Sequence, residues 1–147
     1  MKTYMKILIF SVLIGTVIAI IFYKDIKREV NAIIKKDDII YLFQVGVFKS
    51  EENALEFQEN YDYSIIYNDK EYYRVVIGVS TSKDAKEILT NYFNKYFDDY
   101  YIKEVKASKS LINELVAFEI VLLKTSKDEV ISSINKSMLK TFITYNS

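Results

Sequence analysis

The periodicity of hydrophobic and polar positions changes several times after residue 38. Some stretches are dense in β-branched and aromatic residues, which is typical of strands. Between these stretches, the residues that follow Ser50 and Ser82 include apolar side chains at helical spacing. These patterns predict strands at residues 39–47, 63–67, 71–79 and 100–105, and helices that begin at Ser50 and Ser82.

The two predicted helix starts share one chemistry. Ser50 precedes Glu51 and Glu52, and Ser82 precedes Asp84 after one residue. A serine hydroxyl accepts hydrogen bonds from the free amides of the first turn, and acidic side chains suit the positive end of the helix. Each predicted helix then carries one apolar stripe, formed by Ala54, Leu55, Gln58 and Tyr61 in the first and by Ala85, Ile88, Leu89, Tyr92, Phe93 and Tyr96 in the second.

The order strand, helix, strand occurs twice, which indicates a duplicated unit. Gly46 and Gly78 stand 32 positions apart (78 − 46), and each is expected to form a tight corner between a strand and a helix. Two such units with right-handed crossovers predict an α+β fold of order βαββαβ. In this fold a four-stranded antiparallel sheet carries both helices on one face, and we expect the other face to be open.

The residues of the open face follow from the two-residue period of strands. The apolar sets Phe43, Val45, Val47 and Tyr73, Val75, Ile77 are expected to face the helices. Gln44, Tyr72 and Arg74 then point together to the open face. An amide, an aromatic ring and a guanidinium group suit a sugar ligand, but the two-residue period alone favours the alternative that they are ordinary solvated sheet residues.

An apolar run precedes the predicted domain. Residues 7–23 carry no charged side chain, and their length is near the minimum of about 17 residues for a membrane span. We expect residues 1–6 to be a short cytoplasmic tail, residues 7–23 an uncleaved transmembrane anchor and residues 24–38 a juxtamembrane stalk. A cleaved secretory signal is the alternative. Basic residues flank both ends of the run, so the positive-inside rule does not settle its orientation.

Residues 107–147 follow the predicted domain, which spans residues 39–106. Two strongly apolar runs are separated near Ser126, which together with Glu129 matches a capping box. The first run fits a helix, or a helix followed by a strand, and the second has helical spacing. We predict a helical hairpin packed against the domain or the stalk. A docking surface for a partner protein or for a second copy is the alternative.

Composition narrows the chemistry. The chain has 147 residues, a formal net charge of zero, and neither histidine nor cysteine. The commonest general base, the thiolate nucleophile and the usual zinc ligands are therefore missing. The sequence also offers no convincing pair of catalytic carboxylates. We expect a protein without enzymatic activity, metal or cofactor.

Two blocks of the chain resemble a SPOR (sporulation-related repeat) domain. The segment from Gln44 to Ala54 is similar to the start of that domain, and the segment from Tyr72 to Gly78 is similar to its Tyr/Trp-x-Arg-Val-x-x-Gly block. The resemblance covers about residues 39–105. Val47 and Val79 depart from it, since the family has a small or hydroxylated residue after the first glycine and commonly proline after the second.

The resemblance implies a function and an orientation. SPOR domains bind peptidoglycan glycan strands that have lost their peptides, often at division or sporulation septa. They are commonly the outward-facing part of single-span membrane proteins. The resemblance implies glycan contacts at Gln44, Tyr72, Arg74 and Ile102. It also implies an anchor in the cell membrane whose N-terminus is cytoplasmic. The C-terminal helices could then contact another envelope or septal protein.

Two other classes of function use the same predicted topology. An RNA-recognition fold also exposes a four-stranded sheet, but residues 39–105 hold seven basic and twelve acidic side chains, a net charge of −5. Such a domain repels a phosphate backbone, so we expect no nucleic-acid partner. The second alternative is an envelope interaction module, in which the sheet or the C-terminal helices dock a partner protein and glycan plays no part.

Overall fold

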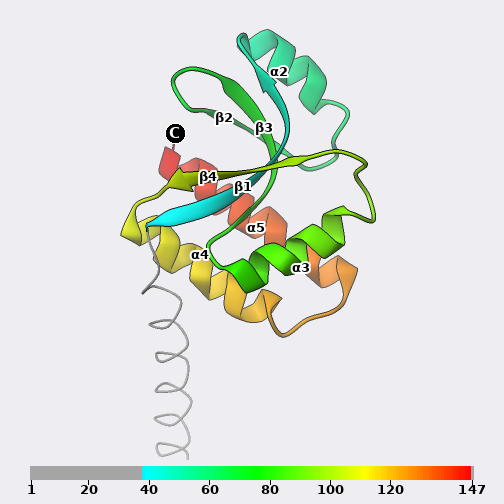
Figure 1. The fold of residues 1–147 in the computed structure, drawn as a ribbon, viewed down its shortest axis with the longest axis vertical. Helices are drawn as coiled ribbons and strands as arrows, with labels where there is room; N and C mark the ends of the chain where they lie inside the picture. The colour runs from blue at the N-terminus through cyan, green and yellow to red at the C-terminus, as the bar shows by residue number, and fades with distance from the viewer. Residues whose placement is uncertain (1–37, 147) are drawn as a thin grey trace, which may run out of the picture. The chain divides into compact units, whose positions relative to one another are not determined.

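The computed structural model describes residues 38–146, which form one sheet with helices packed on it (Figure 1). In chain order the elements are β1 (Ile39–Phe48), α2 (Glu51–Gln58), β2 (Ile65–Asn68), β3 (Tyr73–Ser80), α3 (Lys83–Phe93), β4 (Tyr101–Lys106), α4 (Lys109–Leu122) and α5 (Asp128–Asn146). The predicted tail, anchor and stalk fall outside the described residues, except for Asp38 at the end of the stalk. No helix within residues 38–146 is long and apolar enough to cross a membrane.

The sheet has the strand order β2-β3-β1-β4, and every neighbouring pair is antiparallel. The predicted α+β fold of order βαββαβ is therefore confirmed. The ends of the strands lie within two residues of their predicted positions. This accuracy follows from the clear contrast between the β-branched runs and the polar residues that separate them.

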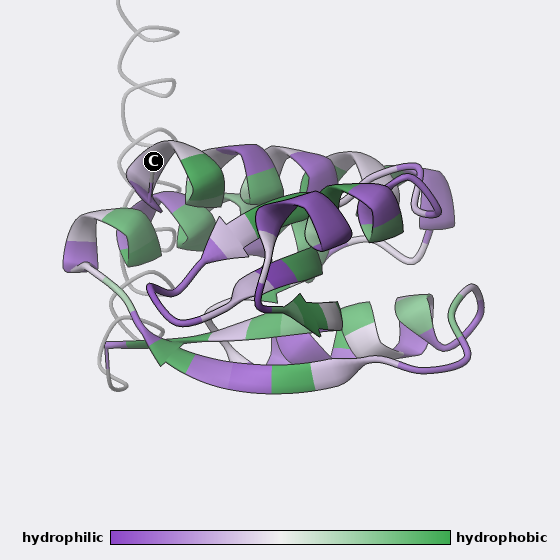
Figure 2. Ribbon diagram, turned by 90° about the horizontal axis from the view of Figure 1, so that it is seen from above, coloured by the Kyte–Doolittle hydropathy of each residue, from purple (hydrophilic) through white to green (hydrophobic). Residues whose placement is uncertain are grey.

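Ser50 and Ser82 cap their helices as predicted. The Asn53 amide donates to Ser50 Oγ at 3.2 Å, and the Ala85 amide donates to Ser82 Oγ at 3.2 Å. Each serine thus satisfies one of the amides that have no partner in the first turn. The helices appear banded in Figure 2, because hydrophobic and hydrophilic residues alternate along each ribbon, as amphipathic helices require.

Helices α2 and α3 pack on the same face of the sheet. The ring of Phe93 in α3 lies against Phe43, with ring centroids 5.1 Å apart. On α2, the Phe57 ring lies directly over Gly46. The prediction that both helices share one face is therefore confirmed.

The prediction that the two glycines form corners is wrong. Gly46 and Gly78 lie inside β1 and β3, and neither has a positive φ. A Cβ atom at Gly78 would come within 2.6 Å of the Phe93 ring, and one at Gly46 within 2.6 Å of the Phe48 ring. Both positions hold glycine because an aromatic ring lies against the strand there. Among the described residues, Lys70 in the β2–β3 turn is the one non-glycine residue with a positive φ, at 75°.

Two β-bulges break the alternation of faces along β1 and β3. Phe43 pairs with Gly78 and Gln44 pairs with Val76, so Ile77 has no partner in β1. Gly46 then pairs with Val75, so Val45 has no partner in β3. Each extra residue reverses the face of the residues that follow it. Gly46 therefore faces α2, whereas Val47 pairs with Arg74 and shares its face. The strict two-residue period placed both on the wrong side.

The C-terminal segment is an antiparallel hairpin of α4 and α5, as predicted. The Tyr145 hydroxyl donates to the Glu114 carboxylate at 2.6 Å, which joins the end of α5 to the start of α4. Helix α5 packs on β3 and β2, and in Figure 1 it passes behind the strands. Tyr67 pairs with Arg74 in the sheet, and its ring lies 5.1 Å from the Phe142 ring of α5.

The second face of the sheet is therefore covered over much of its area, and the prediction of an open face is wrong. Apolar residues of β1 and β3 on the Gln44 side are fully buried: Ile40, Leu42, Val76 and Val79. These positions give the strands a second hydrophobic surface. The hairpin covers it because exposure of that surface to water would be costly.

Glu119 of α4 attaches the hairpin to the start of α3. Its side chain is fully buried and accepts hydrogen bonds from the Thr81 amide, from the Thr81 hydroxyl at 2.9 Å and from the Ser82 hydroxyl at 2.8 Å. Burial raises the pKa of the Glu119 carboxyl above its ordinary value, against the opposing effect of these hydrogen bonds.

Candidate functional site

Part of the second sheet face lies beyond the hairpin and carries polar side chains. Gln44 of β1 and Arg74 of β3 meet there, and Arg74 Nη1 donates to Gln44 Oε1 at 3.0 Å. This contact brings together two of the predicted site residues. Both are more buried than expected, with 8% of each residue exposed.

Asp69, the first residue of the β2–β3 turn, holds this pair in place. Its Oδ2 accepts from Arg74 Nε at 2.6 Å and from Lys103 Nζ of β4 at 3.0 Å. Its Oδ1 accepts from the backbone amides of Tyr72 at 2.8 Å and Glu71 at 3.2 Å. One carboxylate thus links the turn, β3 and β4.

These contacts determine the charge state of Asp69. Partial burial by itself would raise the pKa of this carboxyl. The hydrogen bonds from the Tyr72 amide, Arg74, Lys103 and the Glu71 amide outweigh that effect and hold the pKa well below its usual range. Asp69 is therefore ionised wherever the protein is folded near neutral pH, and Arg74 keeps a charged partner.

Tyr72 borders the cluster on the turn side. Its half-buried ring centroid lies 5.8 Å from Arg74 Cζ, within the range of a cation–π contact. Three of the predicted site residues, Gln44, Tyr72 and Arg74, are therefore neighbours in space.

The fourth predicted residue, Ile102, lies on the opposite face. Ile102 pairs with Phe43, which faces α3, whereas Tyr101 pairs with Gln44. Tyr101 is 73% exposed, the most exposed of the large hydrophobic side chains in the described residues. The aromatic ring on β4 that shares the face of Gln44 is thus Tyr101, one position before the residue that the sequence indicated.

We call this group the polar sheet patch and define it by Gln44, Asp69, Arg74, Tyr101 and Lys103. Val47 lies at its rim, since it pairs with Arg74 and is 42% exposed. Two cations and one carboxylate give the patch a charge of +1. The patch offers an exposed ring, a fixed guanidinium and an amide, which together suit a ligand with hydroxyl or acetamido groups.

Sequence reasoning missed Asp69, Lys103 and Tyr101. Asp69 stands between two predicted strands, where Asn and Asp are common because they tolerate turn geometry. Its spacing of five residues from Arg74 across a tight turn was the available sign of an ion pair. Lys103 and Tyr101 required the register of β4 against β1, which the sequence does not contain.

Metal binding has no support within residues 38–146, where no cluster of three or more His, Cys, Asp or Glu side chains could hold an ion. Comparison of the chain with protein-family models, with curated proteins and with solved structures gives no match in any of the three. The fold and the polar sheet patch are therefore the basis for a functional proposal.

Proposed function

We propose that this chain is a membrane-anchored, non-catalytic protein that binds peptidoglycan glycan strands stripped of their peptides, through the polar sheet patch. The observation that carries the proposal is the Gln44–Arg74–Asp69 network beside the exposed ring of Tyr101. The resemblance of the Gln44–Ala54 and Tyr72–Gly78 segments to a SPOR domain supports the same ligand class. The proposed site of action is a division or sporulation septum outside the membrane, with the N-terminus in the cytoplasm.

The chemistry of the patch suits a saccharide. An aromatic ring stacks on the apolar face of a sugar, while neighbouring polar groups bond its hydroxyl and acetamido substituents. Arg74 is held by Gln44 Oε1 and Asp69 Oδ2, so its orientation is fixed before a ligand arrives. Within residues 38–146, Gln44 Nε2 makes no hydrogen bond, and it is available to donate to a ligand oxygen.

The hairpin restricts where a glycan strand can lie. Helix α5 occupies the face over β3 and β2, whereas β4 is an edge strand of the sheet. The glycan strand is therefore proposed to run along β4 and β1, over Tyr101 and Lys103. This binding surface is smaller than the whole open sheet face that the sequence alone suggested.

Sedimentation of the full chain with amidase-treated cell wall tests the proposal. Tyr101→Ala removes an exposed ring without opening the core, and we expect it to weaken binding about fivefold, as the loss of one stacked ring implies. Ile102→Ala is the matched control, because this neighbour lies on the other face and should leave binding unchanged. Equal effects of the two variants would refute the patch as the binding site.

The alternative of an envelope interaction module predicts a different result. The apolar residues that line the inside of the hairpin are buried, among them Leu115, Met138 and Leu139. A partner protein would therefore have to use the outer surfaces of α4 and α5 or the patch itself. Sedimentation that is the same with and without wall material would reject glycan binding and favour this alternative.

A further inference from the structure

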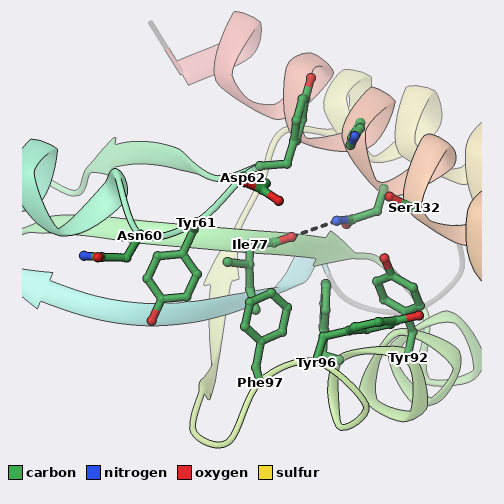
Figure 3. Close-up of a pocket in the computed structure, with 12 residues that line it drawn as sticks. Asn60, Tyr61, Asp62, Ile77, Tyr92, Tyr96, Phe97 and Ser132 are labelled. Atoms are coloured by element: carbon green, nitrogen blue, oxygen red, sulfur yellow. Dashed lines mark hydrogen bonds between the residues drawn. The ribbon is translucent and has the colours of Figure 1, made fainter.

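A second candidate site lies apart from the polar sheet patch and shares no residue with it. A pocket of about 380 Å³ is formed by the end of α3 and the segment that follows it, by α5 and by the connection after α2 (Figure 3). Its walls are largely aromatic and comprise Tyr61, Tyr63, Tyr92, Phe93, Tyr96 and Phe97. The glycan proposal makes no use of this pocket.

The aromatic walls are held in place by mutual contacts. The ring centroids of Tyr61 and Phe97 are 5.8 Å apart, and those of Tyr92 and Tyr96 are 5.0 Å apart. The Tyr96 hydroxyl also donates to Asp128 Oδ2 at 2.9 Å, although the residue is 57% exposed. These contacts fix a set of ring faces, whose negative quadrupole attracts cations.

Acidic side chains outnumber basic ones in the pocket and in the hollows beside it, and Asp62 lines the pocket itself. Two further hollows adjoin it at Tyr61, with volumes of about 380 and 480 Å³. Together the three hollows are lined by four acidic side chains, which are Glu59, Asp62, Asp98 and Asp99, and by one basic side chain, Lys136. The local potential therefore favours a positively charged ligand.

Lys136 shows that an ammonium group is accommodated on this wall. Its Nζ lies 4.7 Å from the centroid of the Tyr63 ring. Lys136 also contributes the one positive charge among the lining residues, so it opposes the binding of a second cation. Its removal and the removal of a carboxylate should therefore change the affinity for a cation in opposite directions.

A buried hydrogen-bond acceptor distinguishes between kinds of cation. Asn135 lines the pocket, is 5% exposed and donates from Nδ2 to the Ile77 carbonyl at 2.7 Å, the contact dashed in Figure 3. Its Oδ1 has no hydrogen-bond partner within the described residues. This oxygen is covered and lies beside Gly78, so a ligand donor reaches it only with a small shift of the Asn135 side chain. Because a buried acceptor without a donor is costly, a ligand that carries an N–H group is favoured over one that does not.

We propose that this aromatic pocket binds a primary alkylammonium group, such as a lysine side chain or a small aliphatic amine. The rings attract the positive charge, Asp62 and the carboxylates of the adjoining hollows strengthen that attraction, and Asn135 Oδ1 favours a cation that donates hydrogen bonds. A quaternary ammonium ion has the charge but no N–H group, so it is expected to bind more weakly.

Titration of the full chain tests this assignment, with tyrosine ring-proton NMR as the readout. The probes are n-butylammonium, cadaverine, Nα-acetyl-lysine N-methylamide and tetramethylammonium. We expect saturable shifts with the three primary amines and weaker binding of tetramethylammonium. Tighter binding of the lysine amide than of cadaverine identifies a lysine side chain as the natural ligand, and the reverse order identifies a free amine.

Two variants with opposite expected effects locate the site. Asp62→Asn, in an exposed connection, should weaken butylammonium binding about two- to fivefold, as the loss of one exposed ion pair implies. Lys136→Gln should strengthen it by a similar factor. Glu52→Gln is the matched control, because it makes the same charge change on an exposed part of α2 outside the three hollows, and it should leave the affinity unchanged.

Asn135→Leu tests the selectivity and should abolish the preference for n-butylammonium over tetramethylammonium. The exposed variants at Asp62 and Lys136 retain the fold and decide the assignment even where Asn135→Leu does not fold. Absence of saturation with every primary amine, or equal affinity for both kinds of cation in the unmodified chain, would overturn the proposal.

Discussion

At the scale of single residues, the pKa values of two carboxyl groups are shifted in opposite directions, that of the partly buried Asp69 downward and that of the buried Glu119 upward. Asp69 gains four hydrogen-bond donors, two of them cationic side chains, and its pKa falls. Glu119 is buried and, among the described residues, accepts hydrogen bonds only from the neutral groups of Thr81 and Ser82, so desolvation dominates and its pKa rises. The difference follows first from burial, because Glu119 is fully buried whereas Asp69 is only partly covered, and second from the two cationic donors that Asp69 has in addition to its backbone amides.

Glu119 makes the stability of the protein depend on pH. Because its folded-state pKa lies above its ordinary value, the folded state binds the proton more tightly than the unfolded state does. The resulting stabilisation is fully present below the ordinary pKa and is lost as the pH rises through the folded pKa. Glu119→Gln keeps an acceptor for the Thr81 amide and stays neutral, so it should remove this loss.

Urea unfolding at about pH 5 and about pH 7.5 measures the effect. We expect the unmodified chain to lose more of its unfolding free energy over this interval than Glu119→Gln does. Glu87→Gln, at an exposed position of α3, serves as the control and should retain the pH dependence of the unmodified chain. Parallel curves for all three proteins would contradict the proposed role of Glu119.

At the scale of secondary structure, the strands, the helices and two of the helix caps could be predicted from the sequence, because each depends on neighbouring residues. The side of the sheet on which Gly46, Val47 and Ile102 lie could not be predicted from the sequence. The bulges at Val45 and Ile77 arise from the fit of β1 against β3, and the face of Ile102 depends on the register of β4. A two-residue period holds only until the first extra residue.

The reinterpretation of Gly78 leads to a prediction about the packing of β3 on α3. A methyl group at Gly78 would come within 2.6 Å of the Phe93 ring, which is 2% exposed and cannot move into solvent. Gly78→Ala should therefore lower the unfolding free energy by about 1–3 kcal/mol, the usual cost of overpacking. Gly46→Ala should cost less, since Phe48 and Phe57 are half-buried and can move outward.

A double-mutant cycle separates packing from backbone effects. If the ring of Phe93 causes the loss, Gly78→Ala should cost less in a Phe93→Leu background than in the unmodified chain, by about 1 kcal/mol. Denaturant unfolding of the four proteins gives this coupling. Strict additivity would show that the ring of Phe93 is not the cause of the loss.

At the scale of the whole described chain, the hairpin and the sheet form one hydrophobic unit. The hairpin was predicted, but its position on the sheet was not, although β1 carried a sign of it. Residues 39–43 are apolar without a break, as in strands that are buried on both faces. The predicted βαββαβ topology, with both helices on one face, favoured an open second face, whereas the unbroken apolar run in β1 indicated that both faces are buried.

This interdependence predicts that residues 39–106 do not fold alone. Without the hairpin, Leu42, Val76 and Val79 would be exposed on the sheet, and Thr81 and Ser82 would lose the Glu119 carboxylate. A unit of this size that exposes one apolar face of its sheet has little stability to spare. We expect residues 38–146 to unfold cooperatively, and residues 38–106 to show poorly dispersed amide NMR signals and no cooperative transition.

A milder change tests the same dependence within the intact chain. Leu115→Ala removes a fully buried side chain of α4, and it should lower the unfolding free energy by about 2–5 kcal/mol. Because the hairpin and the sheet share one core, amides of β1 and β3 should lose protection from hydrogen exchange together with those of α4. Loss of protection in α4 and α5 alone, or a well-folded spectrum for residues 38–106, would instead define the hairpin as a separate unit attached to an independent sheet domain.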